Sequence, residues 1–183
     1  MGLVVNEQMS ANAWADAGLE ALALEGFAAL KADRLAKALG VSRGSFYWHF
    51  RDVPAFHRAV LARWRETASE NVIEGLERHA DARDALRDLL SRAFRATPRL
   101  EAAVRAWASH DAAAREAVLA TDRRRTDYIR ELLARCGAAP DEAEARARLL
   151  YWAFVGFVTS VDPPPRETQQ WIGVDLLRLA GLT

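Results

Sequence analysis

Apolar residues recur along most of the chain at the spacing that one face of an α-helix requires. In the segment that starts at Asp81 they stand at positions i, i+3, i+4, i+7 and i+8, namely Leu86, Leu89, Leu90, Ala93 and Phe94. Because an α-helix turns once every 3.6 residues, these side chains share one side of the helix and can be buried together. The sequence contains no persuasive two-residue alternation of the kind that marks a strand. The pattern predicts an all-α fold.

Capping and helix-breaking residues divide this pattern into about nine helices. Ser10 and Asp52 are suited to cap the first and fourth helices, and Gly26 is suited to end the first. Asp141 followed by Glu144 has the spacing of a capping box. The expected helices cover about 11–25, 32–39, 42–49, 53–79, a segment from 81 that ends before Pro98, one around 100–107, 113–136, 141–160 and 167–180.

The stretch from Leu35 to Phe50 has the features of a helix-turn-helix. Ala36 is small where two helices would cross, and Gly40 can adopt the positive φ that ends the first of them. Phe46 and Phe50 are one helical turn apart and are expected to point inward. The outer face of the second helix then holds Arg43, Gly44, Ser45, Tyr47, Trp48 and His49.

This outer face is poor material for a protein core and suits a DNA groove. Arg43 can reach a phosphate or bind guanine with two hydrogen bonds, while Ser45 and Tyr47 can donate to phosphate oxygens. A glycine at position 44 lets the backbone approach the duplex. Trp48 can pack on a thymine methyl group or a sugar, and His49 can contact phosphate. The alternative is a surface helix with an apolar back and no further role.

In these residues the chain resembles the TetR family of transcriptional regulators. The resemblance covers about residues 11–61, and the string from Val41 to Phe50 carries most of it. It implies a DNA-binding domain over residues 1–52, followed over 53–183 by a helical ligand-binding domain whose last two helices form a four-helix bundle in a homodimer. One position departs from the family pattern. Lys31 stands where members usually have a Thr or Ser cap, so either Asp33 takes part of that role or Lys31 contacts phosphate.

The resemblance also implies a ligand pocket among the C-terminal helices. Large aromatic residues are spread over these helices, with a few polar residues beside them. Taken singly, each aromatic is better explained as ordinary core, and the group suggests a pocket only because the family has one. The predicted pocket residues are Trp64, Phe94, Trp107, His110, Asp111, Tyr128 and Trp152.

The segment from Leu149 to Val158 is apolar on all sides, so a helix there must be buried all round. In a small chain a second copy is the natural cover, although burial inside the same subunit is the alternative. The predicted dimer interface comprises Leu149, Trp152, Ala153, Gly156, Phe157, Trp171, Val174 and Leu177. A run of three arginines, Arg123 to Arg125, is interpreted as a solvated helix face, with anion binding as the less favoured alternative.

Composition adds exclusions rather than a function. Lys plus Arg and Asp plus Glu both total 25, so net charge does not identify a partner. Cys136 is the only cysteine, and the four histidines lack metal-ligand spacing. The longest apolar run has ten residues, against roughly 20 for a membrane span. With no phosphate-binding loop or nucleophile motif, we expect a cytoplasmic protein that is not an enzyme and holds no metal or cofactor.

The sequence-level hypothesis is therefore a ligand-responsive, sequence-specific DNA-binding transcriptional regulator. Its expected partners are double-stranded operator DNA, a small-molecule effector and a second copy of the chain, and it is expected to be a repressor that the effector releases. The alternative is a helical ligand-binding or enzymatic module that keeps the helix-turn-helix only as a scaffold.

Overall fold

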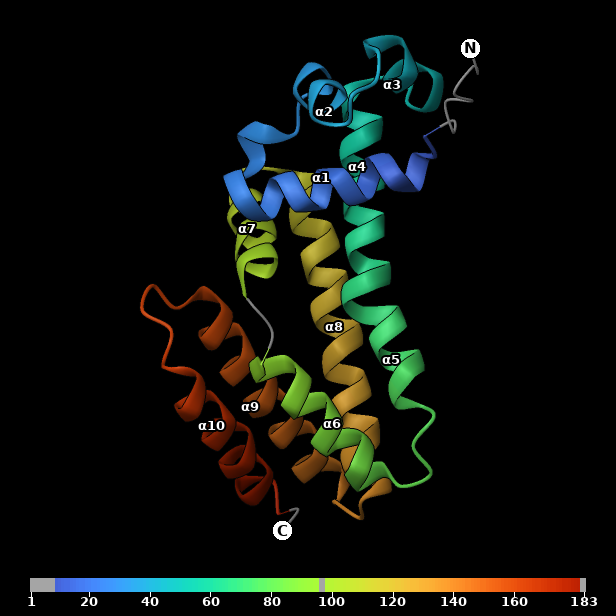
Figure 1. Cartoon of the computed structure of the whole chain (residues 1–183). Helices are drawn as coiled ribbons and strands as arrows, with labels where there is room; N and C mark the ends of the chain where they lie inside the picture. The colour runs from blue at the N-terminus through green and yellow to red at the C-terminus, as the bar shows by residue number, and fades with distance from the viewer. Residues whose placement is uncertain (1–8, 96–97, 182–183) are drawn as a thin grey trace, which may run out of the picture.

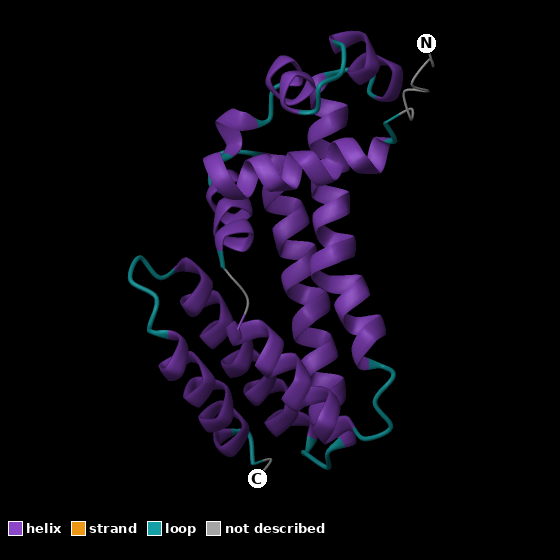
Figure 2. Cartoon of the chain, viewed as in Figure 1, coloured by secondary structure: helices purple, strands orange, loops and turns teal. Residues whose placement is uncertain are grey.

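The computed structural model describes residues 9–95 and 98–181, and these contain helices and no strand (Figure 2). The α-helices are α1 Ala11–Glu25, α2 Ala32–Ala38, α3 Arg43–His49, α4 Val53–Arg65, α5 Asn71–Leu76, α6 Ala82–Arg95, α7 Arg99–Ala108, α8 Ala112–Arg135, α9 Pro140–Thr159 and α10 Arg166–Leu179. A π-helical segment, Glu66–Glu70, joins α4 to α5. Because these three pieces form one continuous rod, the described residues hold nine separate α-helical rods and a short 3-10 helix over Phe27–Ala29, and the predicted all-α class is confirmed.

The helix ends follow from local chemistry at most of the expected positions. The Ser10 hydroxyl accepts a hydrogen bond from the Ala13 amide at 3.1 Å, and the Asp52 carboxylate accepts one from the Ala55 amide at 2.7 Å. Gly26 ends α1 with a φ of 77°, which a residue with a side chain rarely adopts. The predictions for these caps are confirmed.

The predicted capping box at Asp141 is wrong. The helix begins one residue earlier, at Pro140, with Ala139 in the capping position and no side-chain hydrogen bond there. Proline suits the first helical position because its missing N–H would have no helical partner. The carboxylate of Glu144 instead accepts from Arg148 and from Arg130.

Two groups of helices lie at opposite ends of a pair of long rods (Figure 1). The short helices α2 and α3 occupy one end, where α1 crosses α4. The rod formed by α4 and α5 runs beside α8 to the other end, where α6, α9 and α10 pack together.

The buried residues form two hydrophobic clusters. The N-terminal cluster contains Trp14, Phe46, Phe56 and Trp64 from the first four helices, and it also takes in Trp107 of α7. It therefore extends well beyond residue 52. The C-terminal cluster is built mainly from leucine, isoleucine and aromatic residues of α6, α8, α9 and α10.

Gly18 sets the closeness of the crossing between α1 and α4. A Cβ atom at this position would lie 2.7 Å from Cγ2 of Val60 and 2.9 Å from Cζ of Phe56, both of which are fully buried. We expect Gly18→Ala to lower the free energy of unfolding by about 1–3 kcal/mol through overpacking, although alanine favours a helix. Urea unfolding measures this. Gly75→Ala is the control, because its nearest neighbouring atom would be Nη1 of Arg92 at 3.6 Å, an ordinary contact. An equal loss in both variants would contradict the packing argument.

Candidate nucleic-acid interface and ligand cavity

Helix α3 is held against α1 and α4 by the aromatic residues of its inner face. The Phe46 ring is fully buried. It lies edge-on to the Trp14 ring, with the two ring centroids 5.4 Å apart, and its centroid is 5.3 Å from that of the Phe56 ring. Gly40, with a φ of 67°, makes the turn from α2 to α3, and the Val41 amide donates back to the Ala36 carbonyl at 3.0 Å. A rigid inner face of this kind holds the outer face of α3 in a fixed orientation.

The outer face of α3 presents a cation and two aromatic rings to solvent. Trp48 is 76% exposed and Tyr47 is 45% exposed. The Arg43 guanidinium donates to the Tyr47 hydroxyl at 3.2 Å and lies 3.1 Å from a carboxylate oxygen of Asp33. The hydrogen bond to Tyr47 and the nearby Asp33 charge both raise the pKa of Arg43, which stays charged. This surface can therefore donate charge-assisted hydrogen bonds to an anion.

The remaining predicted DNA-contacting residues differ in exposure. Gly44 is exposed and Ser45 and His49 are half-buried. Lys31 is exposed and occupies the capping position of α2, where its side chain makes no capping hydrogen bond. The Asp33 carboxylate pairs with Arg43, and no side chain caps α2 at this position.

A cavity of about 320 Å³ lies between the α4–α5 rod, α6, α7, α8 and α9. Apolar side chains line most of it, and the polar exceptions are few. Two of the predicted pocket residues, Trp64 and Tyr128, belong to the lining. The other lining residues are Ala68, Ser69, Val72, Ile73, Leu89, Leu90, Arg92, Ala93, Pro98, Leu100, Glu101, Arg125, Ile129, Leu150, Tyr151, Phe154 and Val158.

The structure places the other five predicted pocket residues outside this lining. Phe94 packs on Phe157 in the C-terminal cluster, with ring centroids 5.3 Å apart. Trp107 and His110 lie against Phe27, which follows the end of α1. Their ring centroids are 5.0 and 5.5 Å from that of Phe27. The remaining two are Asp111, whose carboxylate caps α8, and Trp152, which is 64% exposed on α9.

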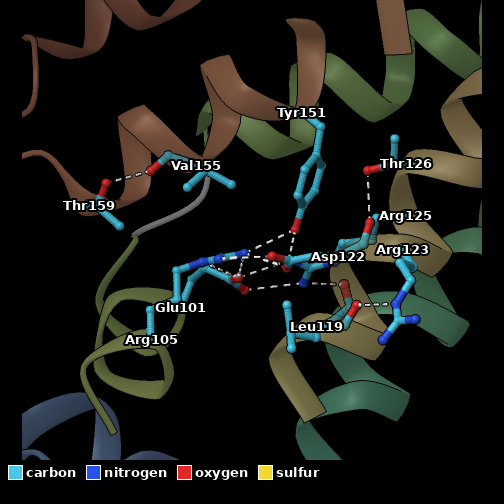
Figure 3. Close-up of polar contacts among 11 residues, drawn as sticks. Glu101, Arg105, Leu119, Asp122, Arg123, Arg125, Thr126, Tyr151, Val155 and Thr159 are labelled. Carbon is cyan, nitrogen blue, oxygen red and sulfur yellow. Dashed lines mark hydrogen bonds and ion pairs between the residues drawn. The ribbon is translucent and has the colours of Figure 1, made fainter. Parts of the chain in front are cut away.

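A network of largely buried charged side chains lies beside the cavity, and its members Glu101, Arg125 and Tyr151 belong to the lining. Glu101 of α7 accepts from Arg105 at 3.1 Å and from Arg125 of α8 at 3.0 Å. Arg105 also donates to Asp122 at 2.7 Å and to the Tyr151 hydroxyl at 3.0 Å, and that hydroxyl donates to Asp122 at 2.6 Å. These side chains point toward one another from three helices (Figure 3).

The interpretation of the arginine run as a solvated face is therefore wrong for Arg125. Its side chain is 13% exposed, whereas that of Arg124 is 40% exposed and Arg123 is exposed. Burial by itself lowers the pKa of the Arg125 guanidinium, but the charge and hydrogen bond of Glu101, together with Tyr151, more than offset it and the pKa is raised. Burial also raises the pKa of the Tyr151 hydroxyl, so it remains protonated and able to donate to Asp122.

Helices α9 and α10 expose an apolar surface. Leu149, Trp152, Trp171 and Val174 are between 40% and 64% exposed. A side chain at Gly156, which is exposed on the same helix as Trp152, would meet no atom within 4 Å. The predicted interface residues that lie deeper are Ala153, Phe157 and Leu177. Thus α9 packs one side on its own subunit and leaves the other side uncovered.

The described part of the chain offers neither a metal-ion site nor a helix that could span a membrane. Among those residues no group of His, Cys, Asp or Glu side chains could hold a metal ion. None of the helices described is long and apolar enough to cross a membrane.

The fold and the α2–α3 pair define a helical protein with an N-terminal helix-turn-helix. Residues 15–52 match the model of the family described as bacterial regulatory proteins, tetR family. No curated protein matches the chain.

Solved structures match almost the whole chain. A protein from Rhodococcus sp., assigned as a TetR-family transcriptional regulator, is 20% identical with a TM-score of 0.72 over 97% of this chain and 100% of its own. A regulator from Saccharomonospora viridis in complex with choline is 15% identical with a TM-score of 0.72, covering 90% and 93% of the two chains. FadR from Bacillus subtilis, in complex with stearoyl-CoA, is 16% identical with a TM-score of 0.67, covering 91% and 95%. The resemblance to the TetR family is confirmed, and the chain has the fold of its transcriptional regulators.

Proposed function

We propose that the chain is a ligand-responsive transcriptional regulator that binds a specific operator in double-stranded DNA as a homodimer. In this proposal residues 1–52 form the DNA-binding domain and residues 53–183 form the ligand-binding and dimerisation domain. The DNA-bound dimer acts as a repressor, and a small-molecule effector in the cavity releases it. The effector must bind the released form more tightly than the DNA-bound form, because equal affinities would leave the equilibrium unchanged.

The observation that carries the DNA-binding proposal is the contrast between the two sides of α3. Its inner side is locked by a fully buried Phe46, while its outer side exposes Arg43, Tyr47 and a 76% exposed Trp48. A helix that served only as a scaffold would have no reason to expose these side chains. The major groove of B-DNA admits an α-helix, and arginine there can bind guanine with two hydrogen bonds. An exposed ion pair such as that of Arg43 and Asp33 contributes little free energy. A phosphate or a base can therefore replace Asp33 as the partner of Arg43.

The exposed apolar surface of α9 and α10 supports the dimer. Large apolar patches are rare on monomeric soluble proteins and usually mark an interface. A two-fold interface is formed by the same surface of each subunit. If its axis ran beside α9 and α10, the interface would bury Trp152 and Trp171 of both subunits. It would also hold two copies of α3 at a fixed separation. Successive half-sites on one side of B-DNA are about 34–36 Å apart.

The π-helical segment offers a route from the cavity to α3. Ala68 and Ser69 of this segment line the cavity, and the Ala68 carbonyl accepts a hydrogen bond from Arg125 at 2.9 Å. Segments of π-helix inside α-helices are often found at functional sites. Because α4 continues from this segment to the contact with α1 and α3, a shift at Ala68 would move the recognition helix. We propose that the effector acts through this contact.

Selection from a random pool of duplexes tests the DNA-binding proposal, and Arg43→Ala then tests the interface. We expect the variant to bind the selected operator roughly 5- to 150-fold more weakly if Arg43 contacts a base, since one bidentate contact is lost. If Arg43 contacts only phosphate, specificity should be unchanged and the slope of log affinity against log salt should fall by about one. Fluorescence anisotropy at several salt concentrations measures both quantities.

Arg87→Ala is the matched control for this experiment. Arg87 forms a comparable exposed pair with Asp84, but it lies on α6 at the opposite end of the molecule. Its loss should leave operator affinity and salt slope unchanged. The proposal fails if no sequence is enriched by the wild-type chain, and Arg43 is excluded from the interface if both variants bind like the wild type.

A further inference from the structure

The charged residues of the cavity wall balance one another. Glu101 and Arg125, which line it, pair with each other, and behind them Arg105 pairs with Asp122. The third charged lining residue, Arg92, pairs with Asp88 at 2.6 Å. Every charge at the wall thus has an opposite charge in contact. A charged ligand would lose its hydration on entry and find no unpaired charge to replace it, which disfavours both anions and cations.

Two aromatic rings of the wall, those of Trp64 and Phe154, are already occupied by a cation and cannot bind an organic one. Rings such as those of Trp64 and Phe154 can bind a quaternary ammonium group on their faces. Here the guanidinium of Arg125 takes that place, with its central carbon 5.6 Å from the Trp64 ring centroid and 5.5 Å from that of Phe154. A second cation beside it would be repelled.

Three residues that line the cavity each carry a buried polar group without a hydrogen-bond partner among the described residues. These groups are the hydroxyls of Ser69 and Tyr128 and the indole N–H of Trp64. Their residues are 2%, 4% and 0% exposed. Buried polar groups without partners are uncommon because each has lost its water without replacing it. Both hydroxyls can donate and accept, and the indole can donate, so together they suit an uncharged oxygen on a ligand.

The size of the cavity limits the ligand further. An engineered apolar cavity of about 150 Å³ binds benzene. This cavity, at about 320 Å³, is therefore large enough for a molecule of about twice the volume of benzene, such as two fused rings. The remaining lining side chains are almost all apolar, so most of the ligand must be hydrocarbon.

We propose that the cavity binds an uncharged, largely apolar molecule about twice the volume of benzene, whose hydroxyl or carbonyl oxygen bonds to Ser69 and Tyr128. This assignment rests on the proposed function in that the same cavity is the effector site, and it names the chemical class of the effector. The indole N–H of Trp64 is the additional donor for a carbonyl oxygen.

Four naphthalene derivatives that differ in one substituent test the ligand class. Isothermal titration of the full chain at neutral pH would compare 2-naphthol and 2-acetylnaphthalene, both uncharged, with the anion 2-naphthoate and the cation (2-naphthylmethyl)trimethylammonium. We expect at least one uncharged compound to bind ten times or more tighter than either charged one. Equal or tighter binding of a charged compound, or no binding of either uncharged one, overturns the proposal.

Variants that remove single hydroxyls test the residues. We expect Ser69→Ala and Tyr128→Phe each to weaken binding of the preferred uncharged compound roughly two- to tenfold, the value of one hydrogen bond. Naphthalene itself, which has no oxygen, should bind each variant as it binds the wild type. Thr121→Val is the matched control, because the Thr121 hydroxyl is also buried and unpartnered among the described residues but lies outside the cavity lining. An equal loss for naphthalene, or the same loss in Thr121→Val, would mean that the hydroxyls do not bind the ligand oxygen.

Operator affinity, measured separately, distinguishes a failure of the ligand-class proposal from a failure of the regulator proposal. If a charged naphthalene binds best while the chain still binds its selected operator, the ligand class is wrong and the regulator proposal stands. If no DNA sequence is selected, the regulator proposal fails whatever the titrations show. If an uncharged compound binds the cavity but leaves operator affinity unchanged, the cavity is a binding site of the stated class and its role as effector site is rejected.

Discussion

Replacing Gly156 by arginine is expected to convert the dimer into monomers. Gly156 lies on the uncovered side of α9, on the same helix as the exposed Leu149 and Trp152. In the proposed interface an arginine there would be buried among apolar groups without a carboxylate to pair with. An uncompensated buried charge costs about 3–5 kcal/mol, so the dimer dissociation constant should rise by at least about a hundredfold. Sedimentation velocity at micromolar concentration measures the change.

Two control variants make this result specific. Gly156→Ala adds a methyl group where no atom lies within 4 Å in the single chain, so its folding should be unaffected and its dimer weakened only if the helices approach very closely. Leu119→Arg places the same charge on α8, at a residue that is 51% exposed and outside the proposed interface. Dimers that persist in Gly156→Arg, or that are lost equally in Leu119→Arg, would place the interface elsewhere.

Loss of the dimer should also weaken operator binding, because one subunit can reach only one half-site. The monomer keeps α3 and its outer face, so binding to a single half-site should persist with weaker affinity. This links the exposed surface of α9 and α10 to the DNA-contacting face. If Gly156→Arg is monomeric and still binds the full operator as tightly as the wild type, the proposed two-fold recognition is contradicted.

The fold could be predicted from the sequence because its boundaries are local. Ser10 and Asp52 bind amides three residues along the chain, and Gly26 and Gly40 take up positive φ in place. The outer face of α3 could be identified for the same reason, since Phe46 and Phe50 determine which side of a single helix is buried. These features depend on neighbouring residues in the sequence, so they can be predicted without knowing how distant segments pack.

Most of the cavity lining could not be predicted because it comes from distant parts of the chain. Trp64 and Trp107 are both fully buried aromatic residues in amphipathic helices, yet only the first lines the cavity. The difference depends on how α7 packs against α1, which no local pattern encodes. Ser69 carried no signal at all, because it lies in the cavity lining as part of a π-helical segment that helical periodicity does not predict.

The burial of Arg125 likewise could not be predicted from a local sequence pattern. Arg125 stands in a run with Arg123 and Arg124, and the sequence treats the three alike. Its partner Glu101 is 24 residues away on α7, so only the packing of α7 against α8 makes it a buried ion pair. A spacing pattern cannot separate one arginine of such a run from its neighbours.

Removal of Arg125 alone should destabilise the protein strongly. In Arg125→Met a buried carboxylate oxygen of Glu101 and the Ala68 carbonyl both lose a donor, while the hydrocarbon volume is roughly kept. Breaking a buried pair by removing one partner typically costs about 3–5 kcal/mol, because the other charge stays buried. Urea unfolding measures the free energy. Arg124→Met is the matched control from the same run, where a long ion pair of 3.6 Å with Glu70 on the surface should be worth only about 0–1 kcal/mol.

Removing both charges should restore much of this loss. In Glu101→Gln with Arg125→Met the remaining Arg105 and Asp122 still balance, and Tyr151 still donates to Asp122. We therefore expect the double variant to be more stable than Arg125→Met, with a coupling energy of about 1–3 kcal/mol in the double-mutant cycle.

The Ala68 carbonyl remains without its donor in both, so if that contact transmits the effector signal, the double variant should fold and bind operator yet respond weakly to ligand. Additive losses would show that Glu101 and Arg125 do not act as a pair, and an unchanged ligand response in the double variant would remove the Ala68 contact from the transmission route.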